Sequence, residues 1–156
     1  MFKVTTEKEL ANAFRPRDRR TLVMPPKVTF PLYIRDYLAW PDPAGGRLFV
    51  LFEEPGTGHA LGLAFRDDGE KGANGLCEWC HNVGNVPGVS LMMCEKNSKR
   101  AIGTWLCKDL ACGNRVENMA DLAGRNGQTA RKQVLERMWK FAHEGLGIER
   151  VPTDQR

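Results

Sequence analysis

Two patterns of hydrophobic residues alternate along the chain, and together they predict an α+β fold. Apolar runs with strand character lie on either side of short polar turns, which is typical of β-hairpins. The predicted strands cover residues 47–53, 59–66, 89–95 and 101–106. Helical spacing of apolar residues predicts helices over residues 6–15, 112–122 and 129–144. We therefore expect a small antiparallel sheet with helices packed against it.

Local signals refine several of these elements. Thr6 followed by Glu9 is a capping arrangement for the first helix, which should end near Arg15 because Pro16 disfavours helical geometry before it. The dense apolar stretch 32–40 is interpreted as one or two helical turns on the core. Gly62 within a strand indicates close backbone approach or a bulge.

The remaining segments are assigned by composition and by residue spacing. The arginine-rich residues 15–20 and the glycine-rich residues 67–75 are predicted to be loops. The helix over 129–144 has an apolar inner stripe and a basic outer face. The inner stripe consists of Ala130, Val134, Met138, Phe141 and Ala142. The outer face consists of Arg131, Lys132, Arg137 and Lys140.

The length of 156 residues fits one domain. We predict a single α+β domain over residues 1–150, with a helix and β-hairpin part over 1–76 and a loose tail over 151–156. No window approaches the roughly 18 apolar residues that a bilayer-spanning helix needs, and the N-terminus has no apolar signal core. We therefore expect a cytoplasmic protein without membrane contact.

Four of the five cysteines form two close pairs, Cys77 with Cys80 and Cys107 with Cys112, and 26 residues lie between the pairs. Paired thiols in a reducing cytoplasm are more often metal ligands than disulfides. Four thiolates make a closed tetrahedral zinc site without an open position for a substrate. We therefore predict structural Zn²⁺. A knuckle, a hairpin and a helix that supplies the last ligand form a treble-clef zinc finger, predicted over 77–122.

Alternatives to this ligand set stay open at this point. Cys94 lies in a predicted strand without a nearby partner and is interpreted as a small buried hydrophobe. His81 follows Cys80 and could replace a thiolate, although a role in the knuckle turn is favoured. His59 and His143 are interpreted as surface residues. Two other interpretations of the four paired cysteines are buried structural cysteines without a metal and a thiol redox centre.

Nothing in the sequence indicates catalysis. A catalytic zinc site keeps one position open and commonly has a carboxylate base nearby. Glu78 lies inside the first pair, but the His-x-Glu motif of zinc deaminases is missing, since His59 is followed by Ala60 and Leu61. The glycines of residues 56–58 lack the Lys-Ser/Thr of a phosphate loop. We expect a protein that is not an enzyme and has no small-molecule substrate.

The zinc-bearing half is basic, with ten basic and four acidic residues from Lys96 to Lys140. Such an excess is consistent with an anionic partner or with a solvated face. The candidate partner-binding residues are Lys96, Lys99, Arg100, Lys108 and Arg115. Direct RNA or DNA contact through the same patch is the alternative, with Trp79 or Trp105 as a stacking surface. For both tryptophans the favoured interpretation is a core position, since large aromatic residues commonly pack around small zinc lobes.

Several motifs in order resemble the C-terminal treble-clef domain of elongation factor G-binding proteins, a family that includes fusidic-acid resistance proteins. They are Cys77-Glu78-Trp79-Cys80, Pro87-Gly88-Val89, Gly103-Thr104-Trp105-Leu106-Cys107 and Asp109-Leu110-Ala111-Cys112-Gly113-Asn114-Arg115-Val116. The resemblance implies that zinc is a scaffold and that the partner is elongation factor G or another translation protein. Ribosomal RNA is a second candidate partner, because of the basic patch. Family members carry a helical bundle before this domain, and we expect 156 residues to leave no room for it.

Overall fold

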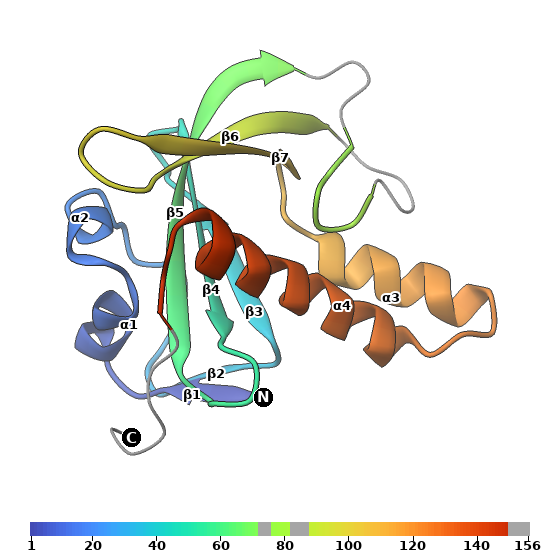
Figure 1. The fold of residues 1–156 in the computed structure, drawn as a ribbon. Coiled ribbons are helices and arrows are strands. Elements are labelled where there is room, and N and C mark those ends of the chain that lie inside the picture. The colour runs from blue at the N-terminus through green and yellow to red at the C-terminus, as the bar shows by residue number, and fades with distance from the viewer. Residues whose placement is uncertain (72–75, 82–87, 150–156) are drawn as a thin grey trace.

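The computed structural model describes residues 1–71, 76–81 and 88–149 and has the α+β architecture expected from the sequence (Figure 1). The strands are β1 (Phe2–Val4), β2 (Leu32–Ile34), β3 (Tyr37–Pro41), β4 (Arg47–Glu53), β5 (Ala60–Lys71), β6 (Val89–Glu95) and β7 (Ala101–Cys107). The helices are α1 (Glu7–Ala13), α2 (Pro16–Arg19), α3 (Cys112–Leu122), α4 (Gly127–Lys140) and the π-helical turn η1 (Phe141–Gly145).

Strands β3 to β7 form one antiparallel sheet in chain order, and β1 pairs with β2 beside it. Both faces of the sheet are covered, by α1 and α2 on one side and by α4 on the other (Figure 1). Strand β4 is therefore apolar at every position from Leu48 to Phe52, a pattern expected where both faces are buried. Its residues alternate between the two hydrophobic clusters, so β4 lies at the centre of the molecule.

The long strand β5 joins the two halves of the sheet. Residues Ala60–Arg66 pair with β4. Pairing with β6 runs from Arg66 to Lys71, with a shift in register between Asp67 and Lys71. Strand β6 then pairs with β7 over its whole length, from Val89 opposite Cys107 to Glu95 opposite Ala101. The hairpin that carries one cysteine ligand candidate is thus continuous with the central sheet.

Gly62 permits helix α1 to lie directly on the sheet. A Cβ atom at this position would lie 2.5 Å from three ring carbons of Phe14, which is completely covered. Phe14 in turn makes edge contacts with Trp40 and Phe49, with ring centroids 6.1 and 6.3 Å apart. The prediction of close backbone approach at Gly62 is confirmed.

The first helix begins as predicted. Thr6 accepts a hydrogen bond from the backbone N–H of Glu9 at 3.1 Å, and the Glu9 carboxylate accepts one from the N–H of Thr5 at 2.7 Å. The helix ends at Ala13 rather than near Arg15. The arginine-rich segment after it forms the short helix α2 instead of a loop, with Pro16 at the first helical position, where its missing N–H costs nothing.

The prediction of helical turns over residues 32–40 is wrong, because this stretch forms β2 and β3. Leu38 and Trp40 pack in the cluster that contains α1, whereas Tyr37 and Ala39 pack on the opposite cluster. Because β3 pairs with β4 over five positions, its side chains alternate between the two faces of the sheet. This pairing outweighs the local preference for a helix. The polar residues after Arg66 also extend β5 to Lys71 rather than form a loop.

Other features follow the sequence closely. The bounds of α3 agree with the prediction, and α4 begins at Gly127 after Asn126, whose side chain accepts hydrogen bonds from Gln128 and Thr129. No helix among the described residues is long and apolar enough to cross a membrane. The predicted tail over 151–156 lies outside the described residues, and the subdivision at residue 76 stays a prediction.

We expect Gly62→Ala to lower the thermal melting temperature by several degrees, because the added methyl group must displace the Phe14 ring. Overpacking of this kind typically costs about 1–3 kcal/mol. Gly145→Ala is the matched control, since its Cβ would meet its nearest neighbour, Phe141, at an ordinary 3.5 Å. Equal melting temperatures for the two variants would contradict the close contact between α1 and the sheet.

Candidate metal centre

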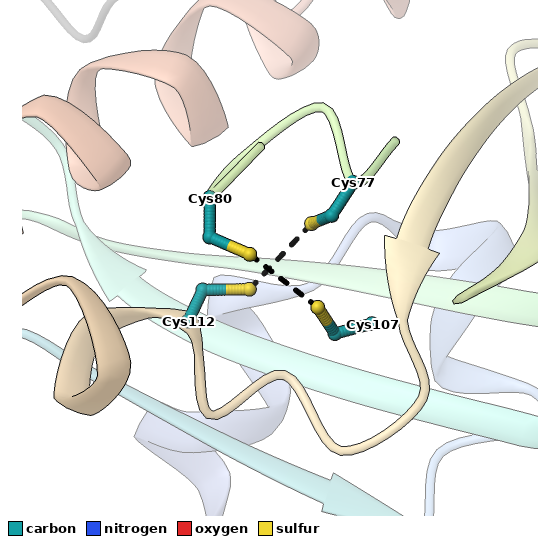
Figure 2. Close-up of side chains that lie close together, drawn as sticks. All are labelled: Cys77, Cys80, Cys107 and Cys112. Carbon is teal, nitrogen blue, oxygen red and sulfur yellow. Dashed lines mark hydrogen bonds between the residues drawn. The ribbon is translucent and has the colours of Figure 1, made fainter. Parts of the chain in front are cut away.

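Three separate elements bring four cysteines to one point. Cys77 and Cys80 lie in the tight turn at residues 77–81, Cys107 ends β7, and Cys112 begins α3. Figure 2 shows the four side chains pointing toward a common centre. A knuckle, a strand end and the first turn of a helix are the elements that the sequence predicted for the treble clef.

The four sulfur atoms fit the geometry of zinc. All four Sγ atoms lie within 4.8 Å of one another, with 3.7 Å between Cys77 and Cys112 and 3.4 Å between Cys80 and Cys107. A zinc–sulfur bond of about 2.3 Å implies sulfur–sulfur separations of about 3.8 Å in a regular tetrahedron. The four cysteines are all buried and none forms a disulfide. They are therefore positioned to hold a structural metal ion, and their donor chemistry matches Zn²⁺.

The crowded thiols also explain how metal binding would couple to protons. Hydrogen bonds from Cys107 and then Cys112 lower the pKa of the Cys77 thiol to about 7. The hydrogen bond of Cys112 to Cys107, together with those to Cys77 and Cys80, raises the pKa of Cys112. Four thiolates can thus coexist only with a cation between them, and zinc binding must release protons.

The first knuckle is fastened by its backbone. The N–H of His81 donates to the carbonyl of Cys77 at 2.8 Å, and the N–H of Glu78 donates to the carbonyl of Trp105 on β7 at 2.8 Å. The Arg137 guanidinium of α4 donates to the carbonyl of Trp79 at 2.7 Å. Strand β7 and helix α4 thus hold the turn that presents Cys77 and Cys80.

Trp79 anchors the same turn in the hydrophobic core. It is almost completely buried and packs edge-on against Phe65 of β5 and Phe141 of η1, with ring centroids 5.8 and 6.5 Å apart. The indole therefore belongs to the core, in agreement with the interpretation favoured from the sequence, and offers no surface for a nucleic-acid base. The cysteines belong to the same hydrophobic cluster, so metal binding and core packing share one region.

Tyr37 supports the loop between the second pair of cysteines. Its hydroxyl donates to the carbonyl of Leu110 at 2.5 Å and accepts from the N–H of Gly113 at 2.9 Å. Leu110 has a φ of +48°, a left-handed conformation that ordinary side chains rarely adopt. The tyrosine thus holds Cys107 and Cys112 at the required spacing, a role that sequence spacing alone did not indicate.

A buried ion pair ties helix α4 to the start of β3. Arg131 bonds both carboxylate oxygens of Asp36 and donates to Asn114 of α3 at 2.7 Å. Its guanidinium also lies 5.9 Å from the ring centre of Tyr37. The prediction that Arg131 lies on the outer face is wrong, because a partner distant in sequence draws it inward. Helical spacing cannot reveal such a partner.

The five basic candidates do not form one surface. Lys108 is exposed beside the cysteines, whereas Arg115 is only 13% exposed and pairs with Asp109 at 3.0 Å. Lys96, Lys99 and Arg100 lie in the β6–β7 turn. That turn is at the other end of the hairpin, six residues along β6 from Val89, which amounts to about 20 Å. Their assignment to partner binding stays a prediction.

The remaining candidates lie outside the metal cluster. Cys94 is buried in the core, and burial raises its pKa to about 12, as expected of an inert hydrophobe. His81 is exposed, and His143 is exposed and stacks on Trp139. His59 is half-buried rather than on the surface, and its Nε2 atom is covered without a hydrogen-bond partner in the described structure.

Comparison with known proteins gives a consistent picture. The model of one family, FBP C-terminal treble-clef zinc-finger, matches residues 7–144. The solved structure of the fusidic acid resistance protein FusC is similar in fold, with a TM-score of 0.54 and 19% identity over 79% of this chain. The match covers 57% of the FusC chain, so this chain spans somewhat over half the length of that protein. No curated protein sequence matches.

We expect Cys112→Ser to reduce bound zinc well below one equivalent and to loosen residues 77–122, because one of four ligands is lost. Elemental analysis and hydrogen exchange measure the two effects. Cys94→Ala is the matched control, since it removes a buried thiol outside the cluster and should retain full zinc. Full zinc content in Cys112→Ser with an unchanged melting curve would remove Cys112 from the ligand set.

We expect Tyr37→Phe to weaken zinc affinity by about tenfold, at the lower end of the effect of groups that orient metal ligands. The variant keeps the ring and loses only the hydroxyl that bridges Leu110 and Gly113. Competition with a chromophoric chelator measures the change. Tyr33→Phe is the control, because Tyr33 is exposed on β2. Identical affinities in the two variants would show that the hydroxyl does not support the metal loop.

Proposed function

Because the chain belongs to the FBP C-terminal treble-clef zinc-finger family, we propose that it is a non-enzymatic, cytoplasmic binding protein for elongation factor G or a related translation protein. The observation that carries this proposal is the buried four-cysteine cluster in the fold of that family. A site with four protein ligands has no open position for a substrate. The metal then acts as a scaffold, and function resides on the surface that it stabilises.

The similarity to FusC supports a role near translation but does not carry drug resistance to this chain. That protein is described as a fusidic acid resistance protein, and this chain matches only 57% of its length at 19% identity. Such similarity concerns the fold. Drug resistance is therefore not part of the proposal, which is limited to binding of the factor.

The surface proposed for the factor lies on the helical pair next to the metal. Met119 and Leu122 of α3 are 40% and 83% exposed, unusual values for large apolar side chains. A cavity of about 330 Å³ opens between the knuckle, α3 and α4, and Met119 and Arg125 line it. Figure 1 shows α3 and α4 projecting together from the sheet.

We expect purified chain and elongation factor G to form a complex of defined stoichiometry that survives nuclease treatment, measured by calorimetry and size-exclusion chromatography. Leu122→Glu should weaken it at least tenfold, because a charge replaces an exposed apolar contact. The control is Tyr33→Glu, a similar change of an exposed side chain on β2.

Two outcomes would refute parts of this proposal. Absence of any complex with the zinc-loaded protein would refute factor binding. A complex that is equally strong in both variants would refute the surface on α3. Replacement of Lys96, Lys99 and Arg100 by serine should change factor affinity less than twofold, since the turn lies at the far end of the hairpin.

A further inference from the structure

A second site lies away from the metal, on the side of the sheet that α1 and α2 cover. A cavity of about 330 Å³ opens between α2, the start of β4, the middle of β5 and the end of β6. Four arginines line it, and they come from three different elements of the chain. They are Arg17 and Arg20 from α2 and the residue after it, Arg47 from β4 and Arg66 from β5.

The cationic charge of this cavity is only partly compensated by the protein. Arg17 pairs with Glu95 at 3.3 Å, but none of the described carboxylates lies within ion-pairing distance of Arg20, Arg47 or Arg66. Arg47 and Arg66 stand directly opposite each other in the β4–β5 register. Like charges in such a cross-strand pair repel each other. An anion between them would remove that repulsion.

The cavity is held in shape by Arg15, which precedes α2. Its guanidinium donates to the carbonyls of Glu95 and Lys96 at the end of β6. It also pairs at 2.9 Å with Asp18, the other acidic residue of the cavity, whose side chain is 7% exposed. The arginine pocket, defined as Arg17, Arg20, Arg47 and Arg66, is thus built on a clamped segment rather than on a free arm.

The surroundings of the arginine pocket extend the basic surface. Ser98 of the β6–β7 turn lines the cavity, so the turn that carries Lys96, Lys99 and Arg100 adjoins it. Figure 1 shows this turn close to α2, at the end of the hairpin remote from the metal. The basic residues of the turn therefore belong with the arginine pocket and not with the zinc lobe.

An apolar shelf continues from the pocket along the same face of the sheet. Met93 stands opposite Arg66 in the β5–β6 register, and Leu91 stands opposite Trp105 in the β6–β7 register. Met93 and Leu91 lie over Gly103, where a Cβ atom would be 2.9 and 3.1 Å from their side chains. All three shelf residues are half-buried, so Trp105 keeps part of its surface accessible. Met93 itself lines the cavity, and Trp105 lies two strands across the sheet from Arg66 and two residues further along β7, about 12 Å away.

We propose that the arginine pocket and this shelf bind single-stranded RNA, with a backbone phosphate between the arginines and a neighbouring base on Trp105. Arginine forks match phosphate oxygens, and aromatic side chains beside basic grooves stack bases irrespective of sequence. An acidic protein segment would use the arginines but has no need of an aromatic shelf on the same face of the sheet. The site is independent of the surface proposed for the translation factor.

The test measures binding of a fluorescent, mixed-sequence 20-nucleotide RNA to the zinc-loaded protein as a function of salt. The double variant Arg47→Gln with Arg66→Gln should bind at least tenfold more weakly at 100 mM salt. Its slope of log affinity against log salt should fall by about 0.7 for each arginine, the value for single strands. Lys132→Gln with Lys140→Gln removes equal charge from the exposed face of α4 and should change affinity less than twofold.

Trp105→Leu provides a second readout, because stacking is not electrostatic. It should weaken binding several-fold with an unchanged salt slope. Melting temperature and zinc content must match the unsubstituted protein in each variant. The proposal is overturned if the unsubstituted protein does not bind RNA at 50 mM salt, or if both double variants lose equal affinity. It is also overturned if a polyglutamate peptide of equal charge displaces RNA as well as unlabelled RNA does, which would identify an acidic protein segment as the ligand.

Discussion

The structure depends on the convergence of four sulfur atoms that no apolar packing would hold together by itself. Thiolates at 3.4–3.7 Å repel one another, and a cation turns that repulsion into attraction. The knuckle, the end of β7 and the start of α3 meet at this point. Trp79 of the knuckle packs against Phe65 and so connects the metal centre to the hydrophobic core. The metal centre therefore fixes the hairpin and the helical pair relative to the sheet.

The two proposed surfaces lie on different sides of the central sheet, and they differ in physical character. Near the metal, the helical pair offers apolar side chains such as Leu122 around a small cavity, a combination suited to a folded protein. On the side that α1 and α2 cover, arginines without an ion-pair partner among the described carboxylates share a face with a half-buried indole, a combination suited to a flexible, regularly charged polymer. If both proposals hold, the two ligands would not compete for one surface.

Much of the metal centre could be predicted because its signals are local. Cysteine spacing indicated the ligands, and hydrophobic pattern placed β4, β6 and α3 with their observed bounds. The failures involve interactions between distant residues. Residues 32–40 form strands, and β3 pairs with β4. Arg131 points inward because it pairs with Asp36, which is 95 residues away in sequence. The grouping of the basic residues likewise depends on strand length and hairpin direction, which residue type does not encode.

The contacts of Asp36 and Tyr37 with the metal lobe have a consequence for the transfer of this lobe between proteins. Asp36, just before β3, pairs with Arg131 of α4. The hydroxyl of the next residue, Tyr37, bonds the carbonyl of Leu110 in the loop before α3. The metal lobe is therefore not an independent folding unit that begins at Cys77. Any transplant to another scaffold, by recombination in nature or in the laboratory, would have to carry the preceding sheet with it.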